Sequence, residues 1–170
     1  MDESNLYLVG PMLSGKTTIS KILGPRMGRE IFETDTEIER LVGMDIPAIF
    51  SKYGEPHFRD LETQILHAAS VRRNLIVSTG GGVVIRPENR AIMHTTGEVI
   101  WIDVALPILL ERRRRKAEQA GRPLAGNLES LYLGRRLWYQ VVADYVVRID
   151  VEAPAEEVAE RVLKIISEKE

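Results

Sequence analysis

A segment near the start of the chain, Gly10 to Thr17, has the residue types and spacing needed to hold a phosphate chain. GPMLSGKT matches the pattern GxxxxGK[ST] and lies between an apolar run and a segment with helical spacing, the context that this pattern requires. Gly10 and Gly15 let the backbone curl so that its N–H groups point at phosphate oxygens, and the following helix adds its positive end. Lys16 would reach the β- and γ-phosphates, and the Thr17 hydroxyl would bind Mg²⁺. The sequence therefore predicts a site for ATP with Mg²⁺.

Acidic, arginine and glycine residues that could handle a second substrate follow the next apolar runs. Glu33 and Asp35 come after the second run, Arg59 lies on the next helical segment, and three glycines at 80–82 follow the third run. Open parallel sheets bind ligands at the carboxyl ends of their strands, so these residues are expected near the phosphate segment. Asp35 could orient an acceptor hydroxyl and take its proton, or it could only cap the following helix.

Short β-rich runs alternate with longer segments of helical spacing along the chain. The runs occupy residues 6–9, 31–33, 75–78, 99–103 and 146–150. Strict alternation implies βαβ units, so we predict a three-layer α/β fold, with a five-stranded parallel sheet and helices on both faces. Residues 117–127, AEQAGRPLAGN, contain two Gly and a Pro after a charged helix and are interpreted as a mobile lid.

The composition limits the classes of protein that this chain can belong to. Its 170 residues are 44% apolar, enough for one core, so we expect residues 1–170 to form a single domain. Lys+Arg 23 against Asp+Glu 25 gives a net charge of -2, and Arg112–Arg115 would point in four directions on a helix, so neither nucleic acid nor membrane is expected as a partner. With no cysteine, no export signal and no long apolar stretch, we expect a soluble, cytoplasmic monomer that binds small molecules.

In order and spacing, these motifs resemble the shikimate kinase family across nearly the whole chain. The resemblance rests on GPMLSGKT, on Glu33-Thr-Asp35 and on the segments FRD at 58–60, TGGG at 79–82, RPL at 122–124 and RRLWY at 135–139. It implies a P-loop kinase fold with a mobile lid. It also implies transfer of the γ-phosphate of ATP, with Mg²⁺, to the 3-hydroxyl of shikimate, a step of chorismate and aromatic amino-acid biosynthesis.

The resemblance implies roles for individual residues. The catalytic set is Lys16, Asp35 and Arg122, with Arg122 closing over the phosphates from a lid at about 116–127. The residues expected to bind ATP are Gly10, Pro11, Met12, Leu13, Ser14, Gly15, Lys16, Thr17, Thr18, Arg115, Arg122 and Pro154. Those expected to bind shikimate are Asp35, Arg59, Glu62, Gly80, Gly81, Gly82 and Arg135, with a substrate-binding segment at about 34–62. Thr17 and Glu33 are expected at the metal.

The planar fork of an arginine matches two carboxylate oxygens, so Arg59 and Arg135 suit an acidic substrate. Arg136 is adjacent, and we favour Arg135 because its distance to Tyr139 matches the family spacing.

The chain departs from the family pattern at two places. Glu33 stands where the family usually has Asp, and its extra methylene would place the carboxylate about 1.5 Å further out, which would alter a contact to a magnesium-bound water. Leu137 stands where the family usually has Pro, and Trp138 follows in place of a smaller apolar residue. Leu137 and Trp138 both lie close to Arg135, which is expected to bind the substrate carboxylate.

Two other functions fit part of the pattern. A kinase for another small polyol acid, such as gluconate, would share the phosphate loop but is not expected to combine Arg59, the triple glycine and Arg135. A catalytically quiet ATP-binding regulator is suggested only by the two departures from the family pattern. The joint presence of Lys16, Thr17, Asp35 and Arg122 argues against the regulator.

Overall fold

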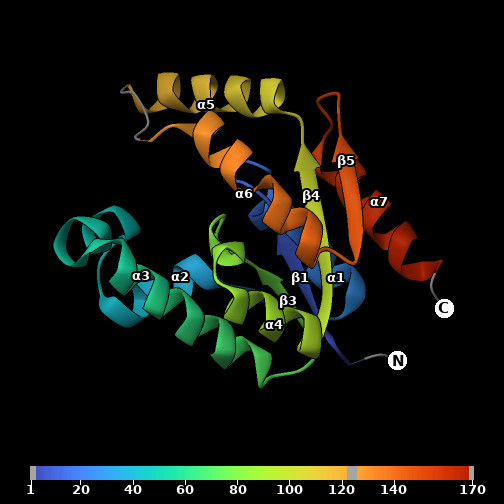
Figure 1. The fold of residues 1–170 in the computed structure, drawn as a ribbon. Coiled ribbons are helices and arrows are strands. Elements are labelled where there is room, and N and C mark those ends of the chain that lie inside the picture. The colour runs from blue at the N-terminus through green and yellow to red at the C-terminus, as the bar shows by residue number, and fades with distance from the viewer. Residues whose placement is uncertain (1–2, 122–125, 169–170) are drawn as a thin grey trace.

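A parallel sheet forms the centre of the computed structural model, which describes residues 3–121 and 126–168 (Figure 1). Its five strands have the order β2-β3-β1-β4-β5. They are β1 (Asn5–Val9), β2 (Glu30–Glu33), β3 (Leu75–Ser78), β4 (Gly97–Val104) and β5 (Tyr145–Ile149). Strand β1 pairs in parallel with β3 on one side and with β4 on the other side. The loops after β1 and β3 therefore lie side by side at the carboxyl ends of the strands, where such folds bind ligands.

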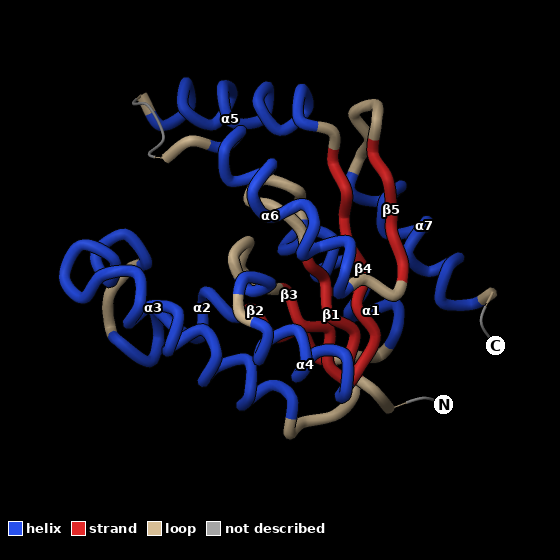
Figure 2. The backbone as a smooth tube through the Cα atoms, in the orientation of Figure 1, coloured by secondary structure: helices blue, strands red, loops and turns tan. Residues whose placement is uncertain are grey.

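Helices cover both faces of this sheet (Figure 2). They are α1 (Lys16–Met27), α2 (Thr34–Val42), α3 (Ile46–Ser70), η1 (Val83–Ile85), α4 (Pro87–Thr96), α5 (Leu106–Ala120), α6 (Leu128–Val142) and α7 (Ala155–Ser167). Alternate side chains of β4 point to opposite faces. Ile100 and Ile102 pack with α1 and α7, whereas Val99 and Trp101 pack with α3, α4 and α6. The predicted five-stranded, three-layer fold is confirmed.

The end of α5 differs from the sequence-based expectation. The loosely structured stretch was expected from residue 117, but α5 continues to Ala120 and ends at Gly121, whose φ of 64° lies in the left-handed region. Arg114 pairs with Glu111 and Glu118, and such pairs one turn apart support a helix. The helix pattern of the charges therefore outweighs the loop signal of the glycines that follow. Residues 122–125 of the expected lid, including Arg122, lie outside the described residues.

Two local features shape the substrate side of the fold. Gly54, with φ 80° and ψ 169°, interrupts α3 and divides it into two helical parts. Asn127 caps α6, because its side chain accepts a hydrogen bond from the Ser130 N–H at 3.0 Å.

No helix in the described part of the chain has both the length and the apolar character needed to cross a bilayer.

Candidate active site

The phosphate loop, residues 10–17, connects β1 to α1 and depends on positive φ angles. Gly10 has φ 149°, and a Cβ at this position would lie 2.8 Å from the Ile102 carbonyl oxygen, so a side chain does not fit. Gly15 has φ 92° and precedes the first residue of α1. Leu13 also has a positive φ, 66°, a conformation that costs energy for a residue with a Cβ. Arg112 from α5 donates a hydrogen bond to the Leu13 carbonyl at 2.8 Å and so holds the strained loop.

Lys16 lies buried beneath this loop. Its Nζ donates to the carbonyl oxygens of Gly10 at 2.7 Å and Pro11 at 2.8 Å. Burial lowers its pKa to about 8, and the nearby Asp35 carboxylate opposes that shift. Lys16 therefore remains mostly charged at neutral pH, at the position where a phosphate chain would meet the loop.

The phosphate loop forms the floor of a cavity of about 600 Å³. The lining residues are 12–19 of the loop and α1, Asp35, Thr79, Gly80, Gly81, Arg112, Lys116, Ile149, Ala153, Ala155 and Val158. The cavity thus has a charged, glycine-rich end near Asp35 and a small apolar end near Ala153 and Val158. Its volume is in the range typical of small-molecule sites.

Asp35 lies in the first turn of α2 and faces this cavity. A Cβ on Gly80 would lie 2.7 Å from its Oδ1, so the carboxylate reaches the triple glycine. The residue at the helix cap is Glu33, and no side-chain cap bond forms there, so the alternative that Asp35 is only a cap is not what the structure shows. Burial raises the pKa of Asp35, and Lys16 partly offsets this effect. The group therefore binds a proton more readily than an exposed aspartate.

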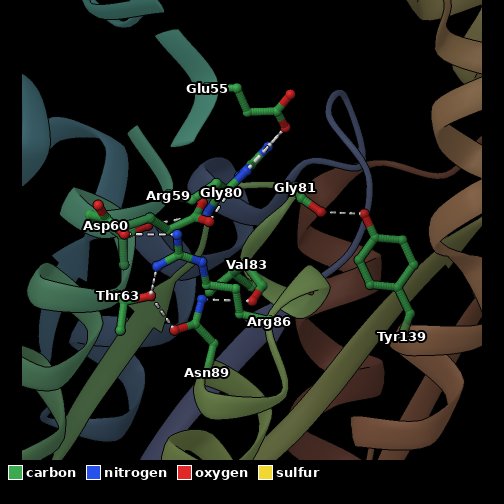
Figure 3. A network of polar contacts seen from close by, with 12 residues as sticks. Glu55, Arg59, Asp60, Thr63, Gly80, Gly81, Val83, Arg86, Asn89 and Tyr139 are labelled. Carbon is green, nitrogen blue, oxygen red and sulfur yellow. Dashed lines mark hydrogen bonds and ion pairs between the residues drawn. The ribbon is translucent and has the colours of Figure 1, made fainter. Parts of the chain in front are cut away.

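Arg59 and Glu62 form a buried pair on α3, with Arg59 Nη1 2.8 Å from Glu62 Oε1. Glu55 lies 3.3 Å from Arg59 on the more exposed side (Figure 3). A Cβ on Gly82 would lie 2.3 Å from Arg59 Nη1, so only glycine allows the guanidinium to lie against this backbone. Burial also raises the pKa of Glu62, and its Oε2 has no hydrogen-bond partner among the described residues. A ligand hydroxyl would satisfy that oxygen.

Two adjacent arginines of α6 have different surroundings. Arg135 Nη1 lies 3.6 Å from the position of a Cβ on Gly81, so it faces the triple glycine. Arg136 instead binds both oxygens of the buried Asp103, at 2.8 and 3.1 Å, and lies over the Trp101 ring. Of the two, Arg135 is the one that lies beside the triple glycine, and its contact with the substrate stays a prediction.

Two residues, Thr17 and Glu33, were expected around the metal. Thr17 Oγ1 lies in the cavity, 3.5 Å from Ser78 Oγ. The Glu33 carboxylate lies 3.5 Å from Lys21 Nζ and accepts a hydrogen bond from Thr36. Within the described ranges, no group of three or more acidic or histidine side chains could hold a metal. The metal role of Glu33 stays a prediction.

On the nucleotide side, the structure favours residues that the sequence did not single out. Arg112 and Lys116 line the main cavity from α5. Arg115 lies in a shallower hollow and pairs with Glu152 at 3.2 Å. Pro154 caps α7 between two cavity-lining alanines. No pattern in four consecutive arginines shows which one faces the loop, because that depends on how α5 packs.

A phosphate loop after the first strand, in a cavity that also contains the Asp35 carboxylate and the triple glycine, is typical of a P-loop phosphotransferase for a small molecule. The family model described as shikimate kinase matches residues 12–167. The chain belongs to the shikimate kinase family.

Individual relatives agree with this family. The chain is 43% identical to a shikimate kinase of Synechococcus elongatus, over 95% of this chain and 86% of the relative. It is 39% identical to that of Acinetobacter baylyi, over 95% and 91%. Among solved structures, the shikimate kinase from Acinetobacter baumannii in complex with shikimate is 34% identical, with a TM-score of 0.89 and coverage of 99% of this chain and 95% of that one. The enzyme from Aquifex aeolicus has a TM-score of 0.82 at 33% identity, with 97% of each chain covered.

Proposed function

We propose that this chain transfers the γ-phosphate of ATP to the 3-hydroxyl of shikimate, giving shikimate 3-phosphate and ADP in the route to chorismate and the aromatic amino acids. The observation that carries the proposal is that one cavity contains both the phosphate loop with Lys16 and the carboxylate of Asp35. The family membership and the relative that was solved with shikimate support this choice of acceptor.

The reaction needs one proton acceptor and several groups that neutralise charge. The acceptor oxygen forms a bond to the γ-phosphorus, the bond from that phosphorus to the β–γ bridging oxygen breaks, and the hydroxyl proton goes to Asp35. Burial raises the pKa of Asp35, which makes its carboxylate a better base, while Lys16 favours the ionised form that can accept a proton. Lys16 and the N–H groups of the loop stabilise charge on the phosphates.

The acceptor would lie against the triple glycine. Arg59 and Arg135 would hold its carboxylate, and the unpartnered Oε2 of Glu62 would accept a hydrogen bond from a ring hydroxyl. Gly82 leaves room for the Arg59 guanidinium, and Gly80 leaves room for Asp35. These two close approaches support a substrate-binding role for the glycines after β3.

The nucleotide would extend from the phosphate loop toward the apolar end of the cavity. Ala153, Ala155 and Val158 offer a surface for the adenine ring, with Arg112 and Lys116 beside it. Arg115 and Pro154 remain proposed adenine contacts from the family resemblance. Arg122, outside the described residues, is proposed to close over the phosphates.

The oxygen donors near the phosphate loop fit a Mg²⁺ ion. Thr17 and Asp35 line the cavity and Ser78 Oγ lies 3.5 Å from Thr17 Oγ1, so the side chains supply oxygens, the donor type that this hard ion prefers. We propose Thr17 as its protein ligand, with Glu33 acting through a water molecule. When bound, Mg²⁺ would neutralise charge on the β- and γ-phosphates. We also propose a monomer in the cytoplasm, and the cysteine-free sequence is compatible with that reducing compartment.

The decisive test is ADP release by the purified chain with ATP and Mg²⁺, measured with shikimate, with gluconate and without an acceptor. We expect release only with shikimate, together with formation of shikimate 3-phosphate. A Lys16→Ala sample prepared in parallel shows whether any activity comes from a contaminating kinase. Release with gluconate alone would assign the chain to the other polyol-acid kinases, and ATP binding without transfer would favour the regulator.

A further inference from the structure

The Tyr139 hydroxyl reaches from α6 to the middle of the triple glycine. It donates a hydrogen bond to the Gly81 carbonyl at 2.5 Å, and Figure 3 shows the side chain pointing at that peptide. The ring is 1% exposed and stacks on Trp101 with a centroid distance of 5.8 Å. Burial raises the pKa of Tyr139 to about 12, so the hydroxyl keeps its proton at any ordinary pH. Tyr139 is therefore a rigidly packed donor.

Gly81 lies at the meeting point of the two halves of the site. A Cβ on it would be 3.2 Å from the Met12 backbone nitrogen of the phosphate loop and 3.6 Å from Arg135 Nη1. Arg135 and Tyr139 are one turn apart on α6, so they approach Gly81 from the same helix. Arg135 and Tyr139 therefore both lie beside Gly81.

Glycine has more backbone freedom than any other residue, so three in a row need external contacts to hold one conformation. The Gly80 N–H donates to Thr34 Oγ1 at 3.1 Å, and the Gly82 carbonyl accepts from the Ile85 N–H at 3.1 Å. Between these two contacts, Tyr139 holds the Gly81 carbonyl. Because the peptide is planar, a fixed carbonyl also fixes the Gly82 N–H in the opposite direction.

We propose that Tyr139 is a positioning residue for the acceptor: it orients the Gly81–Gly82 peptide and keeps it in register with Arg135, so that both can receive the carboxylate of the substrate. The inference rests on the proposed function and deepens it, because it names a side chain that acts on the acceptor through other groups. Tyr139 itself does not take part in phosphoryl transfer.

The test is Tyr139→Phe, which removes the hydroxyl and keeps the buried ring. We expect the KM for shikimate to rise roughly tenfold, the loss typical of one buried hydrogen bond, while kcat and the KM for ATP stay within about twofold. Tyr132→Phe is the matched control. Tyr132 lies on the same helix, and its hydroxyl is 2.5 Å from Arg136 Nη1. That arginine binds Asp103 and not the glycines. We expect this control to keep the parental KM for shikimate. Thermal unfolding of both variants measures how much stability each substitution removes.

The outcomes separate the inference from the function on which it rests. A parent protein with no shikimate-dependent ADP release overturns the proposed function and the inference with it. An active parent whose Tyr139→Phe variant keeps its KM for shikimate overturns the inference alone. An equal rise in both KM values, or an equal effect of Tyr132→Phe, would show a general structural role and would also overturn it.

Discussion

The phosphate loop and the proposed acceptor pocket lie next to each other, but they are built in different ways. The loop is a continuous segment, residues 10–17, whose glycine conformations and following helix create the phosphate site locally. The proposed acceptor pocket would combine Asp35 from α2, Arg59 from α3, the glycines after β3 and Arg135 from α6. On this proposal, nucleotide binding depends mainly on local backbone geometry, whereas acceptor recognition depends on how distant elements pack.

Burial shifts pKa values in opposite directions in the two regions. It lowers the pKa of Lys16 to about 8 and raises the pKa values of Asp35 and Glu62, because it disfavours each charged form. The Asp35 carboxylate limits the pKa shift of Lys16, and the Lys16 ammonium limits the pKa shift of Asp35. Variants that change one region at a time should therefore have distinct kinetic signatures.

Lys16→Ala should have the largest effect, since it removes the cation that stabilises the transferring phosphate. We expect kcat to fall about a thousandfold or more, and circular dichroism should show that the variant keeps its fold. In the parent, kcat/KM for ATP should decline as pH rises through about 8, because Lys16 then loses its proton. A variant within tenfold of the parental kcat would contradict the role given to the loop.

Asp35→Asn should come next, because the amide keeps the shape but accepts no proton from the hydroxyl. We expect kcat to fall about a hundredfold to ten-thousandfold, the range for a general base. The parental kcat/KM should fall as acid protonates Asp35, and this acid limb should lie at a higher pH than for an exposed aspartate, because burial raises its pKa. The limb should disappear in the variant; a limb that persists unchanged would assign the titration to another group.

The two neighbouring arginines of α6 should show the smallest effects and the sharpest contrast. Arg135→Lys should raise the KM for shikimate about tenfold, since an ammonium cannot make a two-pronged contact with a carboxylate. Arg136→Lys should leave that KM within about twofold and lower stability by about 1 kcal/mol, or about 2–4 °C in Tm, through its weakened contact with Asp103. Kinetics and thermal unfolding of the pair test the assignment, and exchanged phenotypes would reverse it.

Most of the architecture could be predicted from the sequence. The apolar run at 75–78 matches β3, and the helical pattern at 16–27 matches α1. The expectation of a loop from residue 117 was wrong, because it followed the glycines after α5 and gave too little weight to the charge pairs one turn apart that support the helix to Ala120. The shikimate kinase family itself was predicted from motif order and is confirmed by the family model.

By itself, the sequence determined the fold class, the phosphate loop and the family, because alternating hydrophobic runs and a contiguous glycine motif encode them locally. Only the tertiary structure decided which of several similar side chains reach the site. Arg112, held against the Leu13 carbonyl, could not be told from its three arginine neighbours, and nothing in the RRLWY motif showed that Tyr139 bonds to Gly81. The physical reason is that the direction of a helical side chain depends on the rotation of its helix against the sheet, which contacts among residues far apart in the sequence determine.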